Sequence, residues 1–242
     1  MRILLLFIYS ESEAYNKMLD LQRKYANTHP EITSYFIQFR NDQSNIIEIE
    51  NDMIYVKGEE HILNITAKTL LAMQYLLCQQ NLIFDFVVRT NVSTVFNFTE
   101  LVKYCNQIPT KNIYTGGCIL NLQWLDHSCG IYDEELFGTI YAQGTCIFLS
   151  YDVACNIIEN RDKIRTDIVD DVAFSIYLNK FLPNALEYLD SLKISGIDTY
   201  CGMTEDDILK HTYTRNKIDY MNPLRTCDLI NMEYIVSVLY SK

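Results

Sequence analysis

Residues that interrupt regular structure are scarce in this sequence, which contains eight glycines and four prolines among 242 residues. No stretch rich in proline, glycine or serine divides the chain, and it has no internal repeat or low-complexity segment. A chain of this length can bury a full hydrophobic core, and 49% apolar and 12% aromatic residues are typical of an ordered protein. We therefore expect one globular domain.

Basic residues are also few. The 20 lysines and arginines are outnumbered by 31 aspartates and glutamates, so the formal net charge is −11. A general nucleic-acid binder carries a basic surface, so we expect no nucleic-acid partner. A small anionic ligand held by a few local donors is compatible with this charge balance.

The eight cysteines show no Cys-x-x-Cys pair and no regular spacing. Zinc sites and disulfide scaffolds are recognised by such spacing, so we expect neither. We predict instead that the cysteines are reduced and packed in the core.

Long hydrophobic runs are missing as well. No stretch approaches the roughly 18–20 apolar residues of a membrane-spanning helix. The apolar residues 3–9 resemble the start of a signal peptide, but Glu11 and Glu13 follow at once and no small-residue cleavage site is present. We expect a buried first strand instead, and a cytoplasmic protein without a membrane span.

Apolar periodicity predicts alternating strands and helices in the first half of the chain. Predicted strands cover residues 2–9, 33–39 and 84–89, with one or two short strands between 47 and 56, and predicted helices cover 13–26 and 65–80. In the second half we predict helices over 98–107 (capped by Thr99), 150–160, from 170 onward and near 228–240, and strands within 112–121, 141–150 and 210–215. Such alternation is typical of βαβ units, so we expect an α/β fold with a mixed sheet.

The most informative stretch is residues 84–96, where an apolar run ends in the polar segment Arg89-Thr90-Asn91-Val92-Ser93. The carboxyl ends of strands in an open α/β sheet present groups to ligands. The guanidinium of Arg89 offers donors suited to a phosphate. An arginine that ends a strand and pairs with a carboxylate would look the same in the sequence.

Four segments, taken in order, resemble motifs of the β1,3-galactosyltransferase and Fringe-like group of glycosyltransferases. Residues 59–70 are similar to the family's D-x-Y-x-N-L-T-x-K-T segment, and residues 84–93 stand where the family has an apolar strand, a basic residue and its acidic D-x-D motif. Residues 141–152 are similar to its Y-x-x-G-x-x-Y-x-L-S-x-D segment, and residues 170–172 are similar to its E-D-V motif. The resemblance covers about residues 50–180.

The resemblance implies a GT-A fold, which is a Rossmann-like mixed sheet flanked by helices, in a single domain over residues 1–242. By the same resemblance, residues of about 1–98 would bind a nucleotide sugar and residues of about 99–242 would bind the acceptor. The implied enzyme is a glycosyltransferase that moves a sugar, with inversion, from a nucleotide sugar to a hydroxyl of a glycan acceptor. The resemblance favours a UDP-sugar as the donor.

One departure from the family pattern concerns the metal. Asn91 and Ser93 stand in place of the two aspartates of D-x-D, and neutral side chains hold a hard divalent cation less well than carboxylates do. We expect either a metal-independent enzyme, in which Arg89 takes up the diphosphate charge, or a weak Mn²⁺ or Mg²⁺ site. The ligands of such a site would be Asn91, Ser93 and, by resemblance, His211.

The resemblance assigns the general base to the pair Asp170 and Asp171, and we favour Asp171. Further predicted donor-binding residues lie at strand ends and turns: Tyr9, Ser10, Thr90, Gln143, Gly144 and Thr145. His211 and Arg215 are additional candidates for the diphosphate. We expect Trp124 to pack in the core rather than to stack on an acceptor sugar.

Two alternatives remain. The missing carboxylates also suit a non-catalytic module that binds a carbohydrate or a nucleotide sugar. A nucleotidyltransferase is less well supported, because no glycine-rich phosphate loop follows the first predicted strand.

Overall fold

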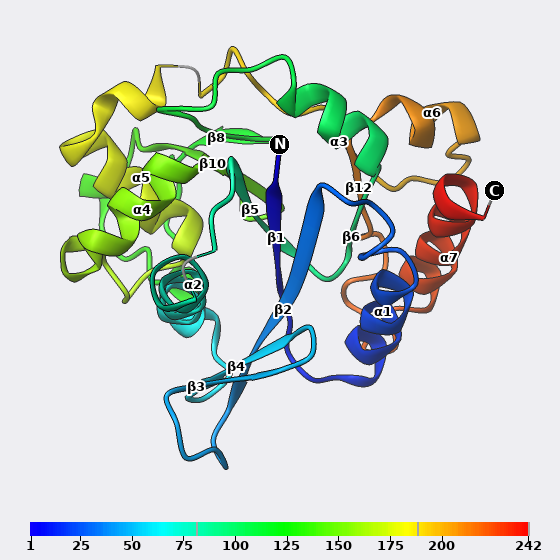
Figure 1. Ribbon diagram of the computed structural model, residues 1–242, viewed down its shortest axis with the longest axis horizontal. Coiled ribbons are helices and arrows are strands. Elements are labelled where there is room, and N and C mark those ends of the chain that lie inside the picture. The colour runs from blue at the N-terminus through cyan, green and yellow to red at the C-terminus, as the bar shows by residue number, and fades with distance from the viewer. Residues whose placement is uncertain (81, 188, 242) are drawn as a thin grey trace.

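The apolar runs predicted as strands meet in one seven-stranded sheet, with the strand order β3-β4-β2-β1-β5-β10-β7. The structure is a computed structural model that describes residues 1–80, 82–187 and 189–241. Strand β1 (Ile3–Ile8) lies inside the sheet and is buried along its whole length. Its six residues are all apolar, as expected for a strand that has other strands on both sides and helices on both faces (Figure 1).

The sheet is mixed, as the sequence predicts. β1 pairs in parallel with β2 (Ile32–Arg40) and with β5 (Phe86–Asn91), and β2 pairs in parallel with β4 (Met53–Lys57). Antiparallel pairing adds the remaining strands: β3 (Ile47–Glu50), β10 (Cys146–Ser150) and β7 (Tyr114–Gly116). The α/β class and the mixed sheet are therefore confirmed.

Helices cover both faces of this sheet (Figure 1). One face carries α2 (Ile65–Gln74), which continues as a π-helical turn (Tyr75–Gln79), together with α4 (Tyr151–Glu159) and α5 (Asp170–Phe181). The other face carries α1 (Glu13–Arg23), α3 (Phe98–Cys105), α6 (Glu205–Lys210) and α7 (Thr226–Tyr240). Single 3₁₀ turns lie at Ile62–Asn64, His127–Cys129, Glu134–Leu136, Arg161–Lys163 and Pro183–Leu186.

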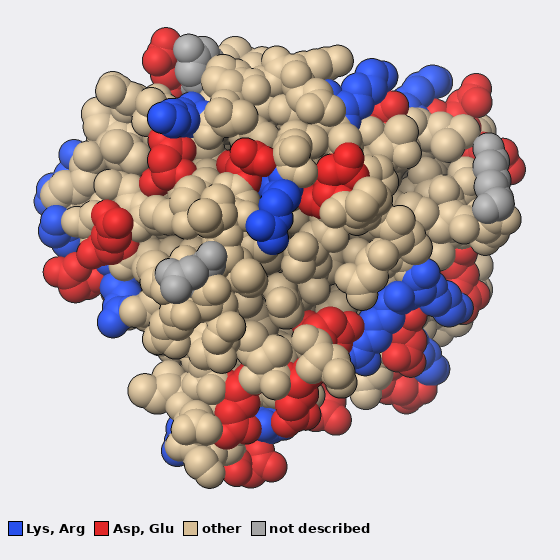
Figure 2. All heavy atoms as spheres, in the orientation of Figure 1, with Lys and Arg blue, Asp and Glu red and all other residues tan. Residues whose placement is uncertain are grey.

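Within the part of the chain that the structure describes, no helix has the length and apolar character needed to cross a membrane. On the face shown in Figure 2, lysine and arginine side chains lie among aspartate and glutamate side chains rather than in one continuous basic surface. The predicted cytoplasmic location stays a prediction.

Two smaller sheets bring distant parts of the chain together. β6 (Thr94–Phe96) follows β5 after a two-residue turn and pairs with β12 (Tyr213–Arg215), which in turn pairs with β11 (Gly196–Asp198). β8 (Ile119–Asn121) and β9 (Ile140–Ala142) form the other small sheet. The β6–β12 pairing delivers the segment around Arg215 to the carboxyl end of β5, more than 100 residues earlier in the sequence.

The short strands β6 and β11 and the helix α6 were not predicted, and three of the predicted elements differ from the structure in detail. The strand predicted over 84–89 runs from Phe86 to Asn91, so it begins two residues later than predicted and includes Thr90 and Asn91. Helix α3 is capped by Asn97, whose side chain accepts a hydrogen bond from the backbone N–H of Glu100, and not by Thr99. The predicted strand 210–215 is shorter, because residue 210 still belongs to α6.

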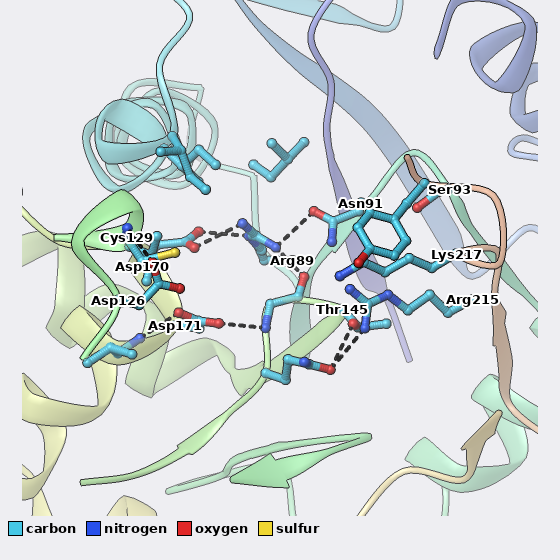
Figure 3. Close-up of a pocket in the computed structure, with 18 of the residues that line it drawn as sticks. Arg89, Asn91, Ser93, Asp126, Cys129, Thr145, Asp170, Asp171, Arg215 and Lys217 are labelled. Atoms are coloured by element: carbon cyan, nitrogen blue, oxygen red, sulfur yellow. Dashed lines mark hydrogen bonds and ion pairs between the residues drawn. The ribbon is translucent and has the colours of Figure 1, made fainter. Parts of the chain in front are cut away.

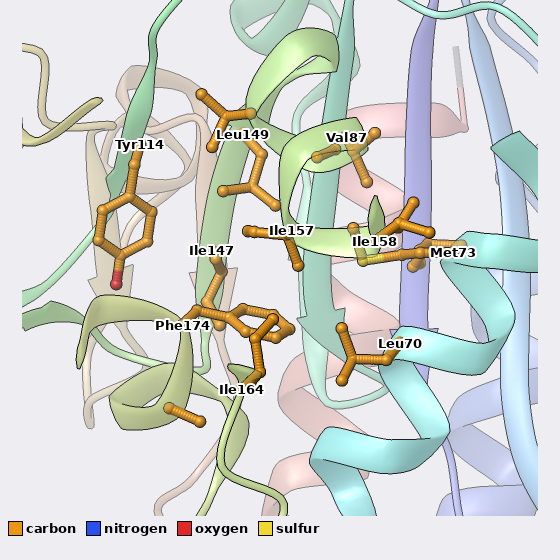
Figure 4. Packing of buried hydrophobic residues seen from close by; sticks show 14 of the residues in the cluster. Leu70, Met73, Val87, Tyr114, Ile147, Leu149, Ile157, Ile158, Ile164 and Phe174 are labelled. Carbon is orange, nitrogen blue, oxygen red and sulfur yellow. The ribbon is translucent and has the colours of Figure 1, made fainter. Parts of the chain in front are cut away.

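The hydrophobic core lies on both faces of the large sheet. On one face, Leu70 of α2, Ile157 of α4 and Phe174 of α5 pack over Val87 and Leu149 of the sheet (Figure 4). The cysteines contribute less than predicted. Within the described chain none forms a disulfide, but only two of the eight are buried, while Cys78, Cys201 and Cys227 are exposed.

We predict that Leu149→Ala lowers the free energy of unfolding by about 2–5 kcal/mol, because it opens a cavity under α4 and α5 in a fully buried position. Urea denaturation followed by circular dichroism measures the change. The matched control is Leu224→Ala, at a position that is 50% exposed, which should change the same quantity by less than about 1 kcal/mol. Equal losses at both positions would contradict the described core.

Candidate active site

A cavity of about 570 Å³ opens where β1 and β5 end. Its walls also include the turn before β10, the first turn of α5 and the segment that follows β12. Ten of the residues predicted from the sequence line it: Ser10, Arg89, Asn91, Ser93, Gln143, Gly144, Thr145, Asp170, Asp171 and Arg215. The strand-end position favoured by the sequence is therefore a cavity large enough for a ligand.

Three predicted residues do not line this cavity. Tyr9 is buried, and its hydroxyl donates to Asn16. Thr90 is fully buried and donates to the backbone oxygen of Thr145. His211 lies at the end of α6, where its Nδ1 contacts the backbone oxygen of Asp207 at 2.6 Å. The structure thus does not bring His211 into the cavity that contains Asn91 and Ser93.

The central feature of the cavity is an ion pair between Arg89 of β5 and Asp170 of α5. Arg89 Nε donates to Asp170 Oδ2 at 2.7 Å, and Arg89 Nη2 donates to Asp170 Oδ1 at 2.9 Å. The two residues are only 3% and 2% exposed. Thr69 of α2 also donates to Asp170 Oδ2, at 3.1 Å. A bidentate pair of this kind fixes both side chains in position.

The remaining side of the Arg89 guanidinium is occupied too. Nη1 donates to Asn91 Oδ1 at 3.1 Å and to the backbone oxygen of Gly144. Most of the N–H donors of Arg89 therefore bind groups of the protein itself, and Asp170 balances its positive charge. This geometry matches the pairing alternative for Arg89 and does not favour its predicted role as the group that takes up diphosphate charge.

Asp171 differs from its neighbour because it is only partly buried and faces the cavity. The backbone N–H of Gly144 donates to Asp171 Oδ2 at 2.9 Å, and that of Val172 donates to Oδ1 at 2.8 Å. Burial and the negative charge of Asp170 together raise the pKa of Asp171 to about 6, against the lowering effect of Arg89 and of the two N–H donors. Asp171 is thus a carboxylate that can exchange a proton near neutral pH.

A third carboxylate, Asp126, lines the same region of the cavity. The hydroxyl of Ser128 donates to Asp126 Oδ1 at 2.6 Å, and this bond lowers the pKa of Asp126. Asp126 was not among the residues predicted from the sequence, although the pattern Asp-x-Ser-Cys is compatible with a capped turn. Trp124 also lines the cavity and is 45% exposed, so the prediction that it packs in the core is wrong.

The other end of the cavity is basic. Arg215 Nη1 donates to Gln143 Oε1 at 3.2 Å, and Lys217 lies beside it (Figure 3). Across residues 1–80, 82–187 and 189–241, neither side chain has a carboxylate within ion-pair distance. We call Arg215 and Lys217 the basic end, and Asp126 and Asp171 the acidic end. Arg215 was predicted from the sequence as a candidate for the diphosphate, whereas Lys217 was not.

Comparison with known proteins shows the family to which the chain belongs. The family model described as Galactosyltransferase matches residues 41–182, which is more than half of the chain. The chain belongs to the galactosyltransferase family. It is a glycosyltransferase, with a sugar donor and a glycan acceptor as its substrates, and the alternative of a non-catalytic module is set aside.

The other comparisons add less. No curated protein matches the chain. A crystal structure of a glycosyltransferase involved in the glycosylation of the major capsid of PBCV-1 is 12% identical, with a TM-score of 0.48, and the match covers 97% of this chain and 100% of that chain. The galactosyltransferase match includes the ion pair and Asp171 but ends before the basic end.

The residues at the expected metal position of this galactosyltransferase-family chain do not fit a divalent cation. Asn91 Oδ1 already accepts a hydrogen bond from Arg89 at 3.1 Å, so a fixed positive charge lies against the oxygen that would bind the metal. Among all residues that the structure describes, no group of three or more His, Cys, Asp or Glu side chains could hold a metal ion. Amide and hydroxyl groups beside a guanidinium are poor ligands for Mn²⁺ or Mg²⁺.

We predict that removing either partner of the buried ion pair, by Arg89→Met or Asp170→Leu, lowers the free energy of unfolding by about 3–5 kcal/mol, because the other charge stays buried alone. The double variant should lose clearly less than the sum of the two single losses. Urea denaturation of all four proteins tests this.

The control for this cycle is the exposed pair Arg165 and Asp167, whose side chains are 41% and 68% exposed. Replacing either partner there should cost less than about 1 kcal/mol. Additive losses for Arg89 and Asp170 would show that the two charges do not depend on each other.

Proposed function

We propose that this galactosyltransferase-family protein transfers a sugar with inversion from a nucleoside-diphosphate sugar to a hydroxyl of a glycan, with Asp171 as the general base. A UDP-sugar is the proposed donor. The observation that carries the proposal is the environment of Asp171, a cavity carboxylate with a pKa near 6. A base with such a pKa can be ionised at neutral pH and still accept a proton.

The choice among the three carboxylates follows from their contacts. Both oxygens of Asp170 are taken by Arg89, and Thr69 adds a further bond, so Asp170 is proposed to position Arg89 and to raise the pKa of Asp171. Asp126 has a lowered pKa, which makes it a weaker base. Asp171 alone combines access to the cavity with a raised pKa.

In the proposed reaction, the acceptor hydroxyl oxygen attacks the anomeric carbon on the face opposite the leaving nucleoside diphosphate. The new carbon–oxygen bond forms as the bond to the phosphate oxygen breaks, and the hydroxyl proton passes to a carboxylate oxygen of Asp171. The N–H groups of Gly144 and Val172 hold this carboxylate in one orientation. A base held in place avoids the cost of ordering it during the reaction.

The two ends of the cavity suit the two substrates. The diphosphate is an anion and is proposed to lie away from the acidic end, while the acceptor hydroxyl lies close to it. Ser10, Asn91 and Ser93 at the strand ends are proposed to contact the donor. Trp124, exposed in the cavity wall, is proposed as a surface on which an acceptor sugar ring stacks.

We predict that Asp171→Asn lowers kcat by about 10²–10⁴-fold, because the amide cannot accept the proton, while the affinity for the donor changes little. Nucleoside diphosphate release from a panel of nucleotide sugars with glycan acceptors measures kcat, and calorimetry measures donor binding. Asp126→Asn, in the same cavity, is the matched control and should keep more of the activity. A fully active Asp171→Asn protein would remove Asp171 from the mechanism.

The pH dependence follows from the direction of the Asp171 pKa shift. Because the base must be ionised, kcat/KM should rise with pH up to about 6 and then level off, and below that value it should fall about tenfold per pH unit. An unshifted aspartate would keep its activity down to about pH 4. Steady-state kinetics between pH 4.5 and 8 distinguish these profiles, and a flat profile across pH 5–7 would contradict the assigned base.

A further inference from the structure

We propose that Arg215 and Lys217 bind the diphosphate of the donor directly, in place of a divalent metal ion. This inference rests on the proposed function, because it concerns the donor of the same cavity. It assigns a role to two residues that lie outside the segment matched by the galactosyltransferase family. The proposed diphosphate site thus includes the end of β12 and the segment that follows it, rather than the end of β5 alone.

The residue between the two cations is firmly anchored. Asn216 donates from its backbone N–H and from its side-chain amide to the backbone oxygen of Ser93, at 2.9 and 3.0 Å. Arg225 donates to the backbone oxygen of Asn216 at 2.6 Å and is itself paired with the buried Asp228. Arg215 and Lys217 therefore flank a fixed residue, so their side chains start from defined positions beside Ser93.

The positive charge of the basic end favours the binding of an anion. Burial lowers the pKa of Lys217, and the neighbouring positive charges of Arg215 and Arg225 lower it further, against the raising effect of Asp198. The charge of Arg225 is balanced by Asp228, but among the described residues Arg215 and Lys217 have no carboxylate within ion-pair distance. Two like charges held together at a cavity are costly until an anion binds between them.

The alternatives for binding the diphosphate are Arg89 and a metal ion beside Asn91, and the contacts of Arg89 argue against both. Arg89 already donates to Asp170, Asn91 and Gly144. Its positive charge also disfavours a cation beside Asn91. Arg225 also lines the cavity, but it is paired with Asp228. The basic end is then the remaining source of positive charge for a diphosphate among the cavity residues described by the structure.

The position of the basic end also fits the reaction. Arg215 contacts the side chain of Gln143, and the next residue, Gly144, donates its N–H to Asp171. Two consecutive residues thus connect the basic end with the proposed base (Figure 3). A diphosphate held by Arg215 and Lys217 leaves the sugar between itself and Asp171, and the cations stabilise the charge that grows on the leaving group.

The test is calorimetric binding of UDP and of inorganic pyrophosphate to the wild-type protein in EDTA and in Mn²⁺. We expect binding in EDTA, with an affinity that Mn²⁺ changes little. The double variant Arg215→Gln/Lys217→Gln should lose about tenfold or more in affinity, because charge-assisted bonds to phosphate are lost. Arg215→Lys keeps the charge and should lose less than Arg215→Gln.

The matched control is Arg161→Gln/Lys163→Gln, which removes two exposed cations at the same spacing from a 3₁₀ turn that does not line the cavity. It should bind both probes like the wild type, and thermal melts should show that both double variants are folded. Binding that needs Mn²⁺, or binding in EDTA that survives the Arg215→Gln/Lys217→Gln change, would overturn the inference. Neither result would affect the proposed base, which the Asp171→Asn kinetics test separately. Absence of binding under every condition, with no turnover of any nucleotide sugar, would overturn the proposed donor as well.

Discussion

The ion pair between Arg89 and Asp170 is the constraint on which the site depends. It joins the inner strand β5 to the first turn of α5, and Thr69 connects α2 to the same carboxylate. Desolvating two charges is costly, and the cost is offset only when both are well paired and hydrogen-bonded. Here the two carboxylate oxygens and three guanidinium nitrogens all have partners. The bidentate ion pair between Arg89 and Asp170 therefore holds α5, the helix that carries Asp171, against the sheet in one orientation.

The properties of the cavity follow from this pair. Burial of Asp171, together with the carboxylate of Asp170 beside it, makes Asp171 hold its proton more tightly than an ordinary aspartate. Arg89, in turn, holds the backbone of Gly144, whose N–H orients Asp171. Since Arg89 is used in this way, we propose that the positive charge for an anionic substrate comes from Arg215, the last residue of β12, and from Lys217 just after it. An acidic protein can thus present a basic surface locally.

Residues 59–70, the first segment that resembles the family, also act through buried contacts. Lys68 is fully buried, forms an ion pair with Glu60 and donates to the backbone oxygen of Tyr9 at the end of β1. Thr69 contacts Asp170. Neither side chain lines the cavity, and both fix elements that do. This motif therefore supports the site rather than forming its surface.

The strong periodic patterns could be predicted from the sequence, because burial on two faces makes β1 continuously apolar and α2 broadly apolar. The short strands β6 and β11 could not, since three residues carry no periodicity. The partner of Arg89 lies 81 positions away, and only the tertiary structure decides whether that arginine meets a phosphate or a carboxylate. Lys217 and Asp126 lie in segments without a recognisable motif. The pairing of β12 with β6 brings Lys217 to the cavity, and the turn that Asp126 caps places Asp126 there.

The most direct test of the account is a crystal structure of the protein with UDP, grown in EDTA and then soaked in Mn²⁺, with anomalous data collected at the manganese edge. The account predicts diphosphate oxygens within hydrogen-bond distance of Arg215 and Lys217, no manganese peak beside Asn91 and Ser93, and an unbroken ion pair between Arg89 and Asp170. A manganese ion that bridges the diphosphate to Asn91 or Ser93, or a diphosphate bound to an Arg89 that has left Asp170, would contradict it.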